Sequence, residues 1–102
     1  MAFLYISEYA DLGNTRNAQT IQMAAAPPVA EQTVANAGAT TQSAAFNNQT
    51  RFVRLHTDTV CSVAFGANPT ATTASARLAA GSTEYFGVPQ GQAFKVAAIL
   101  NT

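Results

Sequence analysis

The sequence predicts an all-β fold: a small antiparallel β-sandwich or a jelly-roll-like barrel of about seven short strands. Three observations support this prediction. Apolar and polar residues alternate with a period of two through the second half of the chain. Turn-forming residues interrupt these runs at short intervals, and no heptad or longer repeat is visible. The 102 residues match the usual size of one domain, so residues 1–102 are expected to form a single β-sandwich domain.

The clearest strands lie in the second half of the chain. Val53 and Leu55 alternate with Arg54 and His56, the period of a half-buried strand in residues 50–58. Residues 60–66 repeat this alternation, and the polar segment 57–59 suits a tight turn. The two runs therefore predict a β-hairpin.

A second hairpin is predicted between residues 82–88 and 92–100. Pro89 presets the backbone for a turn, and Gly91 accepts the left-handed conformation that closes a short loop. Residues 72–81 are ambiguous, because they hold helix-forming residues and Gly81 could cap a short helix.

In the first half, residues 2–9, 18–26 and 42–46 are expected to be strands, and the prolines at 27 and 28 either end the second or confine it to a sheet edge. Residues 1–12 are either an extended N-terminal arm or the first strand of the domain's own sheet. In the first case, partner contacts are expected from the apolar residues Phe3, Leu4, Tyr5 and Ile6.

Composition suggests a thin core and a surface suited to association. Alanine accounts for 22 residues, and its single methyl contributes little on burial. Charged residues are only 10%, and five acidic residues balance five basic ones. A nearly uncharged surface costs little to desolvate, which favours a homo-oligomer or a larger assembly. Nucleic-acid binding is not expected, because it normally needs a basic patch.

The sequence gives no indication of export or membrane insertion. The apolar run at the start ends by Glu8, too short for a signal peptide or a membrane span. The single cysteine, Cys61, cannot form an internal disulfide, and no CxxC pair is present to hold zinc. A protein made and kept in a cytoplasm is expected.

The candidates for chemistry are weak. His56, Asp58 and Cys61 outline a nucleophilic site, but a polar strand face beside a buried cysteine explains them better. The carboxylates are scattered, and no glycine-rich phosphate loop occurs. We therefore expect no enzyme activity, and no catalytic residue, cofactor, metal or small-molecule substrate.

Aromatic and basic residues leave two alternatives open. Tyr5, Tyr9, Tyr85 and Phe86 could form a platform for sugar rings, or they could be ordinary core and rim residues. Arg51 and Arg54 could meet an acidic partner, or they could be the solvated face of a strand.

One resemblance extends from Phe52 to Ile99. The segments "VAFGANPTAT", "LAAGSTEYFGVPQG" and "VAAI" follow one another in an order that resembles capsid cement or decoration proteins of tailed bacteriophages. The resemblance implies a β-sandwich on the virion capsid surface that binds the major capsid protein and ties neighbouring subunits together. A carbohydrate- or receptor-binding module of a phage tail appendage is the alternative.

Overall fold

The computed structural model describes residues 2–14, 17 and 19–101, and within them the protein is all-β and antiparallel, as predicted. These residues form ten strands. The strands are β1 (Phe3–Tyr9), β2 (Leu12–Asn14), β3 (Thr20–Ala24), β4 (Ala30–Ala35), β5 (Thr41–Gln42), β6 (Phe52–Thr57), β7 (Cys61–Gly66), β8 (Ala76–Leu78), β9 (Thr83–Gly87) and β10 (Lys95–Leu100).

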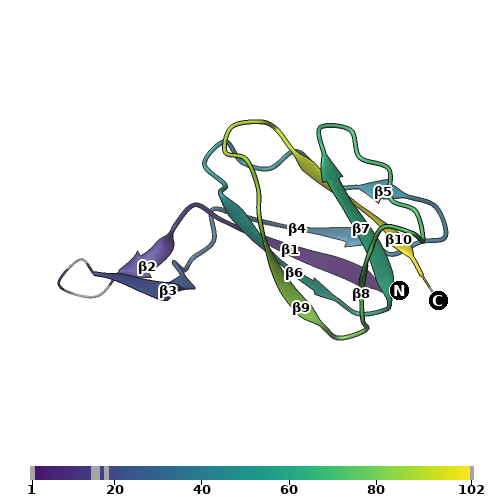
Figure 1. Ribbon diagram of the computed structural model, residues 1–102, viewed down its shortest axis with the longest axis horizontal. Helices are drawn as coiled ribbons and strands as arrows, with labels where there is room; N and C mark the ends of the chain where they lie inside the picture. Colours follow the sequence, from purple (N-terminus) through teal and green to yellow (C-terminus); the bar gives the residue numbers. More distant parts are fainter. Residues whose placement is uncertain (1, 15–16, 18, 102) are drawn as a thin grey trace.

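Two four-stranded sheets face each other across one core (Figure 1). The first sheet has the order β4-β1-β6-β9 and the second β5-β10-β7-β8. A separate two-stranded sheet, β2-β3, leaves one end of the sandwich (Figure 1). The protein is therefore elongated, with extents of 48 × 27 × 21 Å.

The strand pairs nest inside one another, which is the arrangement of a jelly roll. β7 pairs with β8, β6 with β9, and β5 with β10, as in one long hairpin folded over the core. The next pair in this nested series would join β4 to a strand that follows β10. β1 takes the position of that strand and pairs with β4. The two ends of the chain meet there, because Asn36 N donates to Ala2 O and Leu100 N to Ala37 O.

The core consists mostly of branched aliphatic side chains, which corrects the expectation of an alanine-rich interior. Fully buried Leu4 and Ile6 of β1 pack with Val53 and Leu55 of β6 and with Val96 of β10. Among the described alanines only three are buried, Ala71, Ala97 and Ala98. Most of the alanines lie outside the core, so composition alone misjudged where the methyl groups are.

Both predicted hairpins are wrong in their pairing. β6 and β7 follow each other in sequence but lie in opposite sheets, and so do β9 and β10. The turn residues behave as expected, since Gly91 has a φ of 75°. Turn chemistry reverses the chain, but it does not decide whether the next strand pairs with the last one or crosses the core.

The seven expected strands each overlap an observed one, and three further strands were missed. β2 and β8 have three residues each, too few to show a period. β4 is an edge strand in which only Val34 is buried, so its alternation is weak. The helix considered for residues 72–81 is absent, and Gly81 lies in a turn with a φ of 74°.

A buried carboxylate anchors the end of the sandwich nearest the β2-β3 sheet. Glu8 is the last inward-facing residue of β1 and is only 1% exposed. One of its oxygens accepts hydrogen bonds from Asn47 N (2.7 Å) and Thr50 Oγ1 (2.9 Å), and the other from Gln32 Nε2 (3.1 Å). Glu8 thereby ties β1, β4 and the loop after β5 together.

Candidate functional site

The outer surfaces of the two sheets differ in how far they are covered. On the second sheet, Ser62 and Ala97 point away from the core yet are fully buried. The loop 67–75 covers them, held by hydrogen bonds such as Asn101 Nδ2 to Thr73 O and Ala71 N to Thr40 Oγ1. On the first sheet, exposed side chains remain along the side of β4-β1-β6-β9 away from the core, which we call the outer face.

Aromatic side chains gather on this outer face. Tyr9 stacks on Phe52, with ring centroids 5.4 Å apart and an interplanar angle of 17°. Phe52 also contacts Tyr85 at 6.4 Å, and Phe3 contacts Tyr5 edge to face at the same distance. Three different strands supply these five rings, so the cluster exists only in the folded sheet.

Polar side chains share the face with the rings. In the register of the sheet, Arg54 lies opposite Ser7 on one side and Tyr85 on the other. His56 lies opposite Tyr5, and its Nδ1 is 2.8 Å from the hydroxyl of Thr83. The outer face therefore combines ring surfaces with hydrogen-bonding groups.

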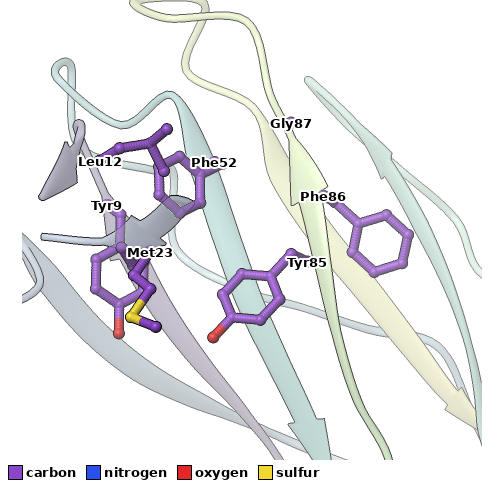
Figure 2. Close-up of a pocket in the computed structure, with 8 residues that line it drawn as sticks. Tyr9, Leu12, Met23, Phe52, Tyr85, Phe86 and Gly87 are labelled. Carbon is purple, nitrogen blue, oxygen red and sulfur yellow. The ribbon is translucent and has the colours of Figure 1, made fainter. Parts of the chain in front are cut away.

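An open groove of about 580 Å³ separates the outer face from the β2-β3 sheet. Its lining residues include Tyr9, Phe52 and Tyr85 of the four-stranded sheet and Leu12 and Met23 of the β2-β3 sheet (Figure 2). None of its lining residues is charged; in addition to these five they are Ala24, Phe86 and Gly87.

The structure divides the expected contact segment Phe3–Ile6 between two surfaces. β1 is an interior strand between β4 and β6, so residues 3–9 do not form an extended arm. Leu4 and Ile6 point into the core, where no neighbour can reach them. Phe3 and Tyr5 point to the outer face and remain candidates for partner contact. All four side chains are hydrophobic, and the two pairs differ because successive residues of a strand face opposite sides of the sheet.

The four aromatic residues considered either as a sugar platform or as core and rim residues are also divided. Tyr5, Tyr9 and Tyr85 share the outer face, whereas Phe86 packs against the core. Phe52 and Glu31 were missed as members of the face. The alternation of residues 50–58 could have indicated Phe52, but only the pairing of β4 with β1 places Glu31 there.

The structure separates Cys61 from His56 and Asp58, the other two residues that outlined a nucleophilic site. His56 lies on the outer face, while Cys61 is buried in the core and 3.5 Å from the hydroxyl of Thr57. Asp58 is exposed in the turn after β6. Among the described residues, no group of three or more histidine, cysteine or acidic side chains could hold a metal ion.

Burial raises the pKa of the Cys61 thiol above its ordinary value of about 9, and the hydrogen bond to Thr57 opposes this only in part. The folded state therefore keeps the thiol protonated at a pH where the unfolded chain ionises. We expect the stability of the protein to fall as the pH rises through about 9, more steeply than that of a Cys61→Ala variant.

Urea unfolding at a series of alkaline pH values measures this difference in slope. Native Cys61 is also expected to react with a thiol reagent only as fast as the protein unfolds. Equal reaction rates in native and unfolded protein would contradict the burial of the thiol.

Comparisons with protein families, with characterised proteins and with solved structures find no match to this chain. The described residues also include no helix long and apolar enough to cross a membrane.

Proposed function

We propose that this protein is a virion structural protein that binds the outer surface of a tailed-bacteriophage capsid and stabilises contacts between major capsid subunits. The observation that carries the proposal is the β2-β3 sheet, which projects from the sandwich as a hairpin (Figure 1). This element, hereafter the hairpin arm, supports the idea of a protein that reaches a neighbouring subunit.

The hairpin arm lacks the internal support that such an element normally needs. An isolated two-stranded hairpin is marginally stable in water. Within the described residues, β2 and β3 pair with each other but do not pack extensively on either four-stranded sheet. Met23 on β3 is 70% exposed, although methionine is usually buried. A partner surface that covers Met23 would supply the missing packing.

Two further properties support a role in a larger assembly. Jelly rolls are a recurrent architecture of viral capsid domains, although the fold by itself does not define a function. Balanced and sparse charge lowers the cost of desolvation when two protein surfaces meet. Repeated contacts on a lattice would then give firm attachment through individually weak sites, in particular for a homo-oligomer.

Removing the hairpin arm tests the proposal. β1 and β4 are antiparallel neighbours, and Val29 N donates to Glu8 O at 2.8 Å, so a short turn can join them. Replacing residues 10–28 with Asn-Gly, a favoured two-residue turn, is expected to leave the sandwich folded. We expect this variant to lose co-sedimentation with capsid shells, with circular dichroism confirming the fold.

A point variant makes the same test without a deletion. Met23→Asp places a charge on the hairpin arm without disturbing the core. We expect it to bind shells at least roughly tenfold more weakly, as measured by co-sedimentation. Val29→Asp is the matched control, because Val29 is also an exposed aliphatic residue but lies outside the arm. Shell binding that survives both the excision and Met23→Asp would refute the proposal.

The aromatic outer face favours a second candidate, a carbohydrate- or receptor-binding module of a tail appendage. Tyr5 and Tyr85 are 42% and 58% exposed, as expected of side chains that contact a ligand. Sedimentation distinguishes the two, because a tail module would not bind empty capsid shells.

A further inference from the structure

Two depressions adjoin each other along the outer side of β6. The first is the groove of about 580 Å³ that Phe52 and Tyr85 help to line. The second, of about 440 Å³, is lined by Tyr5, Arg54 and His56 among others. Because residues 52, 54 and 56 are successive outward positions of one strand, the two depressions form a trough along β6. The trough is apolar at one end and polar at the other.

Several polar groups along the trough have no hydrogen-bond partner among the residues that the structure describes. In the described part of the chain, the hydroxyls of Tyr5, Tyr9 and Tyr85 take part in no hydrogen bond. The guanidinium of Arg54 and the carboxylate of Glu31 likewise have no partner there. These side chains can donate to or accept from a ligand without breaking an internal bond.

The charges along the trough are mixed. Arg54 shares the second depression with Glu31 and Asp58, and the groove at the other end has no charged lining residue. A ligand of either charge would meet a side chain of its own sign there. Charge complementarity therefore favours a neutral ligand with many hydroxyl groups.

The position of the trough on a sheet face favours a sugar over a peptide strand. β1 and β6 are interior strands, paired on both sides, so their backbone groups are already hydrogen-bonded. An extended peptide lying over them would leave its own N–H and C=O groups unpaired, whereas peptide strands normally bind at an open sheet edge. Sugar hydroxyls need only the side chains that the trough offers.

We propose that the trough binds a neutral oligosaccharide that crosses β6 obliquely, from Tyr5 on β1 to Tyr85 on β9. Tyr5 and Tyr85 stack on two different sugar rings, since the C–H face of a pyranose packs on the electron-rich face of an aromatic ring. Arg54 on β6 bonds hydroxyls between the two rings, and Glu31, on β4 beyond β1, bonds a hydroxyl at the Tyr5 end. The stacked pair of Tyr9 and Phe52 forms one wall of the trough, because its rings already cover each other.

The spacing of the two tyrosines sets the minimum length of the ligand. Tyr5 and Tyr85 lie two strands and one outward position apart, which is on the order of 12 Å from strand and residue spacings. A single sugar ring cannot reach both. Affinity is therefore expected to rise from monosaccharide to hexasaccharide.

Titration of the full-length protein with cellohexaose, maltohexaose and chitohexaose, followed by tyrosine fluorescence and calorimetry, tests the proposal. We expect saturable binding of at least one of them and none of glucose or N-acetylglucosamine. Tyr5→Ala and Tyr85→Ala should each weaken that binding roughly tenfold, while Tyr85→Phe keeps the stacking ring and binds nearly as wild type. Arg54→Ala should weaken it as well, and Arg77→Ala is the matched control on the other sheet.

Failure of all three hexasaccharides to bind would overturn the proposal, as would equal binding by the tyrosine variants. If these variants instead lose only sedimentation with capsid shells, the outer face is a protein interface and the saccharide site does not exist. The two proposals fail separately, because the hexasaccharide titration uses no capsid shells and the sedimentation of Met23→Asp uses no saccharide.

Discussion

Replacement of Glu8 with alanine is expected to lower the free energy of unfolding by about 3 kcal/mol. The substitution leaves three buried or half-buried donors without an acceptor, on Asn47, Thr50 and Gln32. Because these donors belong to β4 and to the loop after β5, the loss is expected to loosen that end of the sandwich as a whole. Urea unfolding followed by circular dichroism measures the change.

Two further variants separate the hydrogen bonds of Glu8 from its charge and size. Glu8→Gln keeps one acceptor oxygen but turns an amide toward Gln32, whose own amide group is held by Ala44 N and Ala44 O. We therefore expect an intermediate loss, about 1–2 kcal/mol. Glu31→Ala, an exposed acidic residue on β4, should change stability by less than about 0.5 kcal/mol. Equal losses for Glu8→Ala and Glu31→Ala would show that the buried bonds contribute nothing.

Two adjacent residues of β1 are expected to differ in how much stability the protein loses when each is replaced by alanine. Leu4→Ala should cost about 3 kcal/mol, because Leu4 is fully buried and its removal leaves a cavity between the sheets. Tyr5→Ala should cost less than about 1 kcal/mol, because that side chain is half-exposed on the outer face. Thermal and urea unfolding of the two variants provide the comparison.

The same pair tests which residues of Phe3–Ile6 are open to a partner. If β1 formed a free arm, Leu4→Ala and Tyr5→Ala would both leave the stability of the isolated protein unchanged. If β1 lies within the sheet, Leu4→Ala acts on folding and Tyr5→Ala on binding. The wild-type protein serves as the reference for both measurements.

The hairpin arm and the outer face together suggest how one small protein could carry two contacts. The arm leaves one end of the sandwich, whereas the trough lies along one face of it. A protein held on a lattice through its arm could keep this face turned to the surroundings. Met23 and Tyr85 both border the groove between arm and face, so a large ligand there and a docked partner would influence each other.

Local pattern was enough to identify most strands but not their partners. The alternation of Val53 and Leu55 with Arg54 and His56 correctly assigned the inward and outward sides of β6. The same information predicted hairpins for β6 with β7 and for β9 with β10, and both were wrong. A turn constrains a few dihedral angles, whereas the choice of partner strand depends on which arrangement buries the most apolar surface of the whole chain.

For the candidate site, too, local pattern identified single residues but not their neighbours in space. The sequence left open whether Tyr5, Tyr9 and Tyr85 form a platform or belong to core and rim, and it could not show that Phe52, Arg54 and Glu31 lie beside them. Those neighbours come from strands separated by tens of residues, and only the register of β4, β1, β6 and β9 aligns them.

By itself, the amino-acid sequence determined the all-β class, the facing of the regular strands, the low charge and the turn positions. These properties follow from neighbouring residues and the period of two, which act over a few residues. Only the tertiary structure decided the nested strand order, the burial of Glu8, the projection of the hairpin arm and the composition of the outer face. Each of these depends on contacts between distant segments, whose free energies are realised only when both sheets close on one core.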